Sequence, residues 1–286
     1  MHVFIKSTPS TRDERQYTKH LSAVGSRMSD TDDHKQTVQA AFTRQAEAYA
    51  SNASVTDTER IDRLVRMAGV GPDSRVLEVA TGPGHVAFGF ADVCQEVVGI
   101  DLTDAPLAIA VDRKRDRGVD NAVFLQGDAE SLPFSDDAFD TVVCRLALHH
   151  VEVPARVLEE MVRVCRPDGM VAVEDLVVSE HAERGTYQNE FERLRDPSHV
   201  RALSLSELLE TVAERGIEVE QVRTGTLVPE MEAWLSNAET PDHRAETVRE
   251  MLRADEERDL SGTRPFREDG DLHFVQRTAT VVGRVL

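Results

Sequence analysis

Residues 75–94 read RVLEVATGPGHVAFGFADVC, and this stretch decides how the rest of the chain is interpreted. RVLEVA, residues 75–80, is a short apolar run rich in β-formers, which is typical of a buried strand. Gly82 and Gly84 allow a tight turn and a close approach of the backbone to a ligand, because no Cβ intervenes. The residues that follow have a helical composition, and the first N–H groups of a helix are free to bind a ligand. The stretch therefore predicts a strand, a glycine turn and a helix.

Strand-like and helix-like segments alternate over most of the remaining sequence. Helices are expected at 35–49, 56–68, 104–117, 154–165 and 205–215, and strands at 96–101, 122–128, 139–145, 170–178, 217–223 and 271–286. Such alternation favours a parallel sheet with helices on both faces. The fold class is therefore α/β.

Two segments interrupt the alternation, and the N-terminus differs from the rest of the chain. Residues 179–204 and 228–270 are expected to form helical cap insertions, the first of them over the carboxyl ends of the strands, where open α/β sheets bind ligands. Residues 1–27 are basic and rich in Ser and Thr, so 1–30 is expected to be a mobile tail. Residues 31–286 then form one domain that carries both insertions.

The charge balance excludes some partners. The chain has 286 residues and a net charge of −19, from 33 basic and 52 acidic side chains. Such a surface repels nucleic-acid phosphates and anionic membranes, so neither is an expected partner. Only four of the basic residues are lysines. An acidic, lysine-poor surface suits high salt, where self-repulsion is screened, so a halophilic source is one hypothesis and an ordinary acidic enzyme is the other.

The cysteines and apolar runs bear on location. Cys94, Cys144 and Cys165 lack the spacing of a metal site, and a sparse, odd set suits a reducing compartment. No apolar run has the roughly 20 residues needed to span a bilayer, and the first residues do not read as a secretory signal. A cytoplasmic protein without a bound metal is expected.

Acidic residues occur where the first three strands end or approach their ends. Glu78 lies in the first strand, Asp101 ends the second, and Asp128 follows the third. Together with the glycine turn, Asp101 also matches the looser dinucleotide fingerprint, because it lies 19 residues after Gly82. A nicotinamide-dependent oxidoreductase is therefore one reading of these residues.

Further motifs follow in order along the chain: Leu132-Pro133-Phe134, Phe139-Asp140-Thr141-Val142-Val143 and Arg166-Pro167-Asp168-Gly169. With them, the chain resembles the class I S-adenosylmethionine-dependent methyltransferases, and among these the ubiquinone/menaquinone-biosynthesis-like enzymes that act on small molecules. The resemblance covers about residues 34–224. It implies a Rossmann-like sheet of seven strands, mostly parallel with the last strand antiparallel. It also implies S-adenosylmethionine as the methyl donor and a small-molecule methyl acceptor.

The resemblance also implies roles for individual residues. Ala80, Gly82 and Gly84 would pack against the methionine end of the donor, and Glu78 would hold its amino group through water. Asp101 and Leu102 would bind the ribose and flank the adenine, and Asp128 and Ala129 would hold the adenine edge. Arg145 and Leu146 would line the pocket beyond the fourth strand, and Tyr49 would close over the donor. A core aromatic is the alternative for Tyr49. Relatives commonly have Asp at the position of Glu78, and Pro83 removes one N–H donor from the turn.

Three histidines are candidate catalytic residues. His149 and His150 follow the fourth strand, and His199 lies in the first insertion. Either His149 or His150 could take a proton from the acceptor as a general base, or both could only shape their loop. His199 and Arg201 could lie over the acceptor, or their neighbours Arg195 and Asp196 could cap helices and pair on the surface.

The sequence leaves two questions open. A relative that binds S-adenosylmethionine without turnover would carry the same motifs, and only an assay with labelled cofactor separates it from an enzyme. The oligomeric state is also open, since the 228–270 insertion could cover the active site or pair with a second subunit in a homodimer.

Overall fold

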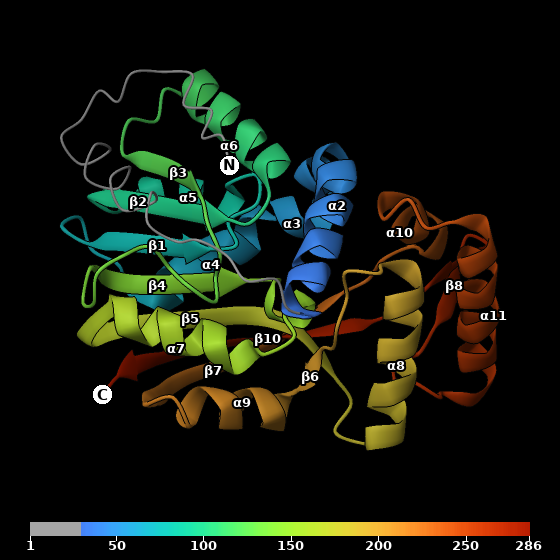
Figure 1. The fold of residues 1–286 in the computed structure, drawn as a ribbon. Helices are drawn as coiled ribbons and strands as arrows, with labels where there is room; N and C mark the ends of the chain where they lie inside the picture. The colour runs from blue at the N-terminus through green and yellow to red at the C-terminus, as the bar shows by residue number, and fades with distance from the viewer. Residues whose placement is uncertain (1–29) are drawn as a thin grey trace.

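The computed structural model describes residues 30–286 (Figure 1). Of the predicted tail, residues 1–30, only Asp30 lies within the described part, as the first residue of helix α2 (Asp30–Ser51). None of the helices in the described part is long and apolar enough to cross a membrane.

The central sheet has the strand order β3-β2-β1-β4-β5-β10-β7, and the short β6 pairs with β5. Its strands are β1 (Arg75–Val79), β2 (Glu96–Asp101), β3 (Ala122–Gln126), β4 (Phe139–Arg145), β5 (Cys165–Val178), β6 (Leu203–Ser204), β7 (Ile217–Leu227) and β10 (Gln276–Val285). Strand β10 runs antiparallel to both β5 and β7, whereas β1 to β5 pair in parallel. The expected α/β fold with an antiparallel last strand is confirmed.

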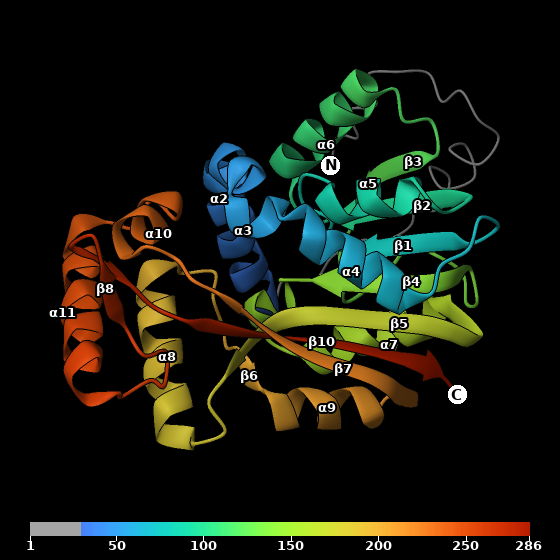
Figure 2. The same cartoon turned by 180° about the vertical axis from the view of Figure 1, so that it is seen from behind.

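Helices cover both faces of this sheet, and Figures 1 and 2 show the two sides. The helices that follow the alternation are α3 (Ala53–Thr56), α4 (Thr58–Ala68), α5 (His85–Ala91), α6 (Asp104–Arg117), α7 (Pro154–Val164) and α9 (Leu205–Ala213), with a 3-10 turn η1 (Leu148–His150) after β4. Helices α4 and α5 pack on one face of the sheet, and α7 and α9 on the other. Fully buried side chains such as Phe90 and Leu158 fill the two layers between sheet and helices.

Several elements have the bounds that the sequence predicts, and others differ for local reasons. Strands β2 and β4 and helix α6 match their predicted ranges, and Gly118 ends α6 with φ +65°. The fifth strand is predicted at 170–178, but β5 already begins at Cys165. The register of its pairing with β4 shifts there and Asp168 has φ +61°, so residues 166–169 bulge within the strand.

The last predicted strand, 271–286, is interrupted. Residues Asp271–His273 form β9, which pairs with β8 (Phe266–Glu268) as a separate hairpin. Strand β10 of the central sheet starts only at Gln276. The apolar pattern of 271–286 does not reveal the break, because both pieces are extended.

The two segments that interrupt the alternation pack on each other beside the sheet (Figure 1). They supply α8 (Ala182–Arg195), α10 (Met231–Asn237), α11 (Asp242–Arg258) and the β8–β9 hairpin. Phe191, Trp234, Leu252 and Phe274 lie in one buried cluster that these elements share. The aromatic rings of Trp234 and Phe274 meet edge to face, with centroids 4.8 Å apart. Helix α2 lies between this cluster and the sheet in both views.

Candidate active site

A pocket lies at the carboxyl ends of the parallel strands, where this fold class binds ligands. The residues that line it are His34, Lys35, Val38, Phe42, Tyr49, Ala80, Gly82, Asp101, Leu102, Thr103, Gly127, Asp128, Ala129, Glu130, Cys144, Leu146, Ala147, Leu148, His150, Val151, Glu152 and Val157. Five of them come from α2, so this helix forms the roof. The first insertion, residues 179–204, was expected to cover the strand ends, but neither it nor 228–270 contributes any of these residues.

The glycine turn forms the floor of the pocket beside Tyr49. Ala80 and Gly82 both have left-handed backbone conformations, with φ of 56° and 52°. A Cβ placed on Gly82 would lie 3.7 Å from the Tyr49 ring, so the turn and helix α2 approach closely here. The backbone N–H of Gly82 donates to Asp101 Oδ2 at 2.8 Å, which ties the end of β2 to the turn.

The Asp101 carboxylate has hydrogen-bond donors around it but, among the described residues, no cationic side chain to balance its negative charge. Its carboxylate accepts from the N–H groups of Gly82 and Thr103, the latter at 2.8 Å, and no ion pair with it is found within residues 30–286. Burial raises the pKa of Asp101 to about 6. A buried carboxylate with spare acceptor capacity suits a ligand that donates hydrogen bonds, such as a ribose.

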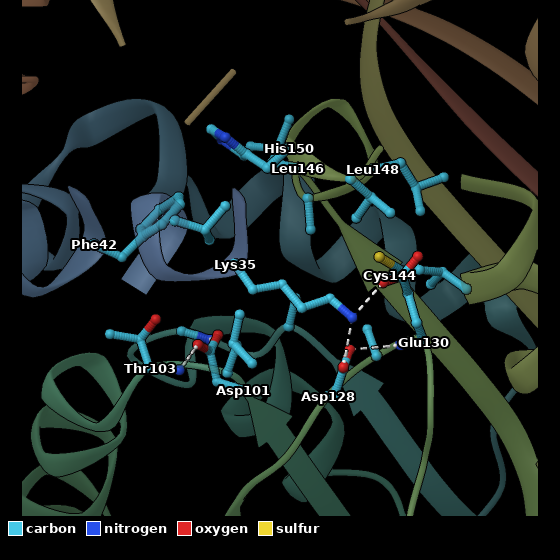
Figure 3. Close-up of a pocket in the computed structure, with 18 of the residues that line it drawn as sticks. Lys35, Phe42, Asp101, Thr103, Asp128, Glu130, Cys144, Leu146, Leu148 and His150 are labelled. Carbon is cyan, nitrogen blue, oxygen red and sulfur yellow. Dashed lines mark hydrogen bonds and ion pairs between the residues drawn. The ribbon is translucent and has the colours of Figure 1, made fainter. Parts of the chain in front are cut away.

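Lys35 of α2 reaches across the pocket to Asp128 (Figure 3). Its ammonium lies 2.7 Å from Asp128 Oδ2 and also pairs with Glu130. Neither Lys35 nor Glu130 belongs to a motif that stands out in the sequence. Lys35 is one of only four lysines in the chain, but nothing in its spacing shows that it faces two carboxylates 93 and 95 residues later.

Two buried oxygens in the pocket have no protein partner in the described part of the chain. These are Thr103 Oγ1 and Glu130 Oε1. Thr103 lies beside Asp101, and Glu130 lies beside Asp128 (Figure 3). Since buried polar atoms are normally hydrogen-bonded, both oxygens fit a ligand that brings its own donors, as the hydroxyl and amino groups of an adenosyl moiety would.

The opposite side of the pocket is mainly apolar. Figure 3 places Leu146, Leu148 and His150 across the cavity from Asp101 and Asp128. Phe42 meets the His150 ring edge to face, with centroids 5.0 Å apart. The pocket therefore has one end with carboxylates and hydroxyls and another with hydrocarbon and one imidazole.

Of the predicted donor-binding residues, eight line the pocket: Tyr49, Ala80, Gly82, Asp101, Leu102, Asp128, Ala129 and Leu146. Glu78, Gly84 and Arg145 do not. Glu78 is buried below the turn, where Thr81 Oγ1 donates to it at 2.6 Å and Ala87 N at 2.7 Å, and burial raises its pKa to about 8. Gly84 caps α5 with φ +79°, and a Cβ there would lie 2.9 Å from the Phe124 ring.

Arg145 points away from the pocket, because neighbouring strand residues face opposite sides and Cys144 takes the pocket side. Its guanidinium lies 3.0 Å from Glu174 on β5, and Arg60 of α4 lies 2.9 Å from the same carboxylate. Thr280 Oγ1 on β10 also donates to Glu174, at 2.8 Å. These buried residues join α4 to three strands and leave Arg145 no place in the pocket wall.

The three predicted histidines do lie together, although only His150 lines the pocket. The ring centroids of His149 and His150 are 4.2 Å apart, and those of His149 and His199 are 5.4 Å apart. His149 Nδ1 bonds to Asp175. Burial alone lowers the pKa of His149, but the Asp175 carboxylate outweighs it and the net shift is upward.

His199 and its neighbours hold the insertion against this cluster. His199 Nε2 lies 2.8 Å from Asn189 Oδ1 inside the fold, and Arg201 is exposed and pairs with Glu207 at 2.8 Å. Neither lies over the pocket. The Arg195 guanidinium lies 4.7 Å from the centre of the Trp234 ring, and Asp196, 3% exposed, accepts from Ser198, so these two residues do not form the surface pair considered as the alternative.

Comparisons with known proteins agree with this geometry. A family model described as a methyltransferase domain matches residues 77–173. The YcgJ protein of Bacillus subtilis, named as an uncharacterized methyltransferase, is 33% identical over 220 residues, which are 76% of this chain and 87% of YcgJ. Its crystal structure superposes with a TM-score of 0.75 and 30% identity, over 80% of this chain and 98% of that chain. The chain belongs to the class I S-adenosylmethionine-dependent methyltransferases.

Two further relatives match less than half of this chain and less than half of their own length. The ubiquinone/menaquinone biosynthesis C-methyltransferase UbiE of Ectopseudomonas mendocina is 39% identical over 113 residues, 38% of this chain and 44% of UbiE. The demethylmenaquinone methyltransferase of Renibacterium salmoninarum is 39% identical over 121 residues, 42% of this chain and 49% of that enzyme. This methyltransferase therefore uses S-adenosylmethionine, and the nicotinamide-dependent alternative is set aside.

Proposed function

We propose that this methyltransferase transfers the methyl group of S-adenosylmethionine to a small-molecule acceptor by in-line displacement. The observation that carries the proposal is that the pocket at the strand ends has two unlike ends. Carboxylates and unpartnered oxygens lie at one end, and hydrocarbon with one imidazole lies at the other. A donor held at the first end leaves the second for an acceptor.

The residues at the polar end suit the adenosyl part of the donor. Asp101 and Leu102 would hold the ribose, Asp128 and Ala129 the adenine edge, and Thr103 Oγ1 supplies a further acceptor. Lys35 already pairs with Asp128, so the adenine amino group would share this carboxylate with the lysine or displace it.

The turn and helix α2 would hold the methionine part. Ala80 and Gly82 would lie beneath it, and Tyr49 would close over it from α2. Glu78 would act from below, by fixing the turn through Thr81. We therefore assign Glu78, Gly84 and Arg145 supporting roles in place of direct contacts with the donor.

The cofactor supplies a methyl group already activated on a sulfonium, so the chain has mainly to align the acceptor. Alignment can account for about 7–11 kcal/mol of a reaction barrier in ideal cases. Leu146, Leu148 and Phe42 would exclude water and hold a flat apolar acceptor. The names of the UbiE and demethylmenaquinone relatives, which denote work on quinone-type molecules, support an acceptor of this shape.

Calorimetry with S-adenosylhomocysteine and with NAD tests the donor assignment. We expect S-adenosylhomocysteine to bind and NAD not to bind. Incubation with labelled S-adenosylmethionine and a panel of quinols, phenols and amines then tests turnover. If S-adenosylhomocysteine binds but no compound in the panel is methylated, the result would favour the alternative that this protein binds the cofactor without catalysing methyl transfer.

The net charge of −19 supports the proposal that nucleic acids and anionic membranes are not partners of the enzyme. The sparse, odd set of three cysteines supports a reducing compartment, and the cytoplasm is the proposed location. A homodimer stays an open alternative to a monomer, and sedimentation of the purified chain decides between them.

A further inference from the structure

Asp196, Ser198 and His150 form a chain of hydrogen bonds that ends at the pocket. Ser198 Oγ donates to Asp196 Oδ1 at 2.6 Å, and the N–H of Ser198 donates to the same oxygen at 2.9 Å. His150 Nδ1 lies 3.0 Å from Ser198 Oγ. Ser198 is fully buried, and Asp196 is 3% exposed. Asp196 and Ser198 are therefore held together away from solvent, whereas His150 is half-buried and lines the pocket.

The directions of these bonds determine the tautomer of His150. Because the hydroxyl hydrogen of Ser198 goes to the carboxylate, its oxygen can only accept from the imidazole. His150 Nδ1 must then carry the hydrogen, which leaves a lone pair on Nε2. Within residues 30–286, Nε2 makes no hydrogen bond to the protein, and the residue lines the pocket.

We propose that Asp196 and Ser198 are positioning residues that hold His150 as the Nδ1–H tautomer, so that Nε2 accepts the proton of an acceptor hydroxyl. This inference rests on the proposed function and narrows it. The acceptor carries an ionisable hydroxyl, of the phenol or enol class, on a flat apolar body. Leu146, Leu148 and Phe42 surround the imidazole with hydrocarbon that suits such a body.

The step balances without a further reactant. The hydroxyl proton passes to His150 Nε2 while the oxygen bonds to the methyl carbon and the carbon–sulfur bond breaks. The electron pair of that bond stays on sulfur, which gives S-adenosylhomocysteine, and the acceptor becomes a methyl ether. The imidazolium then returns its proton to solvent.

Burial, with help from the neighbouring His149, keeps the ring of His150 neutral before the reaction. His149 of η1 is paired with Asp175 of β5, and His199 of the insertion lies on the other side, with centroids 6.3 Å from His150. Burial and the charge on His149 lower the pKa of His150 to about 4, and Asp196 opposes this. From α2, His34 Nε2 contacts the carbonyl of His150 at 2.8 Å, not its ring.

The chain offers a matched control for a substitution in the hydrogen-bonded relay formed by Asp196, Ser198 and His150. Asp255 and Ser261 make the same kind of buried contact in the insertion, with Ser261 N 2.7 Å from Asp255 Oδ1 and the hydroxyl also on this carboxylate. Ser261 is as fully buried as Ser198. Neither Asp255 nor Ser261 lines the pocket, so S261A repeats the chemical change of S198A without touching His150.

Long-range proton–nitrogen NMR of the full chain, labelled at histidine nitrogens and saturated with S-adenosylhomocysteine, reads the tautomer directly. We expect the Nδ1–H form of His150 between about pH 6 and 8 in the wild type and in S261A. Circular dichroism first establishes whether S198A and D196N are folded. In the folded variants the Nε2–H form of His150 should gain population. A wild type in the Nε2–H form, or a wild-type tautomer retained in folded S198A, overturns the relay.

Ligand binding supplies the second readout. In the presence of S-adenosylhomocysteine, 1-naphthol should bind about tenfold more tightly than 1-methoxynaphthalene, since only the naphthol donates a hydrogen bond to Nε2. This preference should vanish in S198A and persist in S261A. Equal binding of the two probes to the wild type, or no binding of 1-naphthol, contradicts the assigned acceptor class.

The same samples separate this inference from the proposed function. S-adenosylhomocysteine should bind the wild type, S198A and S261A within about twofold, because the relay does not touch the polar end of the pocket. Failure of the wild type to bind S-adenosylhomocysteine would contradict the proposed function. Normal binding together with the Nε2–H tautomer of His150 would contradict only the relay. With a phenol that the wild type methylates as substrate, S198A and D196N should lower kcat by on the order of 10²–10⁴-fold with little change in KM.

Discussion

Asp101 at the end of β2 is the residue on which donor binding should depend most. Its carboxylate is buried, bonded only to backbone N–H groups within the described residues, and open to the pocket. Replacing it by Asn removes a charged acceptor, and hydrogen bonds to charged groups contribute about 1.5–3 kcal/mol. We therefore expect D101N to weaken S-adenosylhomocysteine binding by about 10- to 100-fold in calorimetry. D112N, on the exposed face of α6, is the control, and unchanged binding by folded D101N would contradict the assignment.

The protonation of the same residue predicts a pH dependence. The pKa of Asp101 is raised to about 6 by burial, so the carboxylate is charged above pH 6 and neutral below it. Since the charged form is the better acceptor, affinity for S-adenosylhomocysteine should fall as the pH drops through 6. The slope should be absent in D101N. An equally steep fall in D101N would place the titrating group elsewhere.

At the residue scale, the sequence predicted that Asp101 and Asp128 lie at the pocket, but it wrongly placed Glu78 there and missed Glu130. Asp101 and Asp128 follow strand ends and reach the pocket as expected. Glu78 and Arg145 lie in the same motifs, yet they face the protein interior, because their direction depends on strand alternation and on partners such as Glu174. Glu174 lies 29 residues after Arg145, and no local pattern links them.

Helix α2 is the element that should respond to the donor. Lys35 pairs with Asp128 and Glu130, and Gln39 Nε2 donates to the Leu102 carbonyl at 2.9 Å. Exposed or half-exposed ion pairs contribute up to about 1 kcal/mol, which corresponds to a factor of about five in local opening. K35Q should therefore speed hydrogen exchange of the first turns of α2 by about two- to fivefold.

S-adenosylhomocysteine should slow the same amides in the wild type, because it fills the space under α2. K114Q, on α6, is the control for the loss of a lysine charge. If neither K35Q nor the ligand changes the hydrogen-exchange rates of the α2 amides, the helix is held in place by other contacts.

The buried group around Glu174 should stabilise the joint between α4 and the sheet. Glu174 is 2% exposed and pairs with Arg60 and Arg145. E174A leaves two buried guanidinium groups without their carboxylate, and breaking a buried ion pair costs about 3–5 kcal/mol. We expect a lower Tm and denaturant midpoint for E174A, whereas E220A, which removes a partly exposed partner of Arg284, should change them little.

The pH dependence of this loss follows from the pKa of Glu174. Burial alone would raise that pKa, but Arg145 and Arg60 together hold it below its usual value. The stabilisation is therefore present above the unfolded-state pKa and is lost as the pH falls through the lower folded-state value. The Tm difference between wild type and E174A should be largest near neutral pH and should shrink in acid.

At the element scale, periodicity predicted the alternating part of the fold and missed the parts without alternation. The β2, β4 and α6 bounds agree because each has clear flanking signals, such as Gly118. The β8–β9 hairpin was missed, because its three-residue strands are too short to show a period. The roof of the pocket was also misplaced, since whether α2 or an insertion covers the strand ends depends on packing.

The whole molecule should be stabilised by salt if its surface is adapted to it. The net charge is −19, and most of the compensating cations are arginines. Raising KCl from 0.1 to 1 M shortens the screening length from about 10 to about 3 Å and removes much of the self-repulsion. We expect the Tm to rise steadily with KCl. Sorbitol, which stabilises proteins without ions, serves as the comparison, and no gain from KCl beyond that of sorbitol would favour an ordinary acidic enzyme.

The sequence by itself determined the α/β class and the position of Asp101 and Asp128 at the strand ends that border the pocket. These features rest on local composition, periodicity and motif order, which the chain carries without reference to its folded shape, whereas the antiparallel last strand was implied only by the family resemblance. Only the tertiary structure decided that α2 roofs the pocket, that Arg145 turns inward to Glu174, and that Asp196 and Ser198 reach His150. Such contacts join residues 29 to 93 positions apart, and their geometry arises only when packing brings distant segments together.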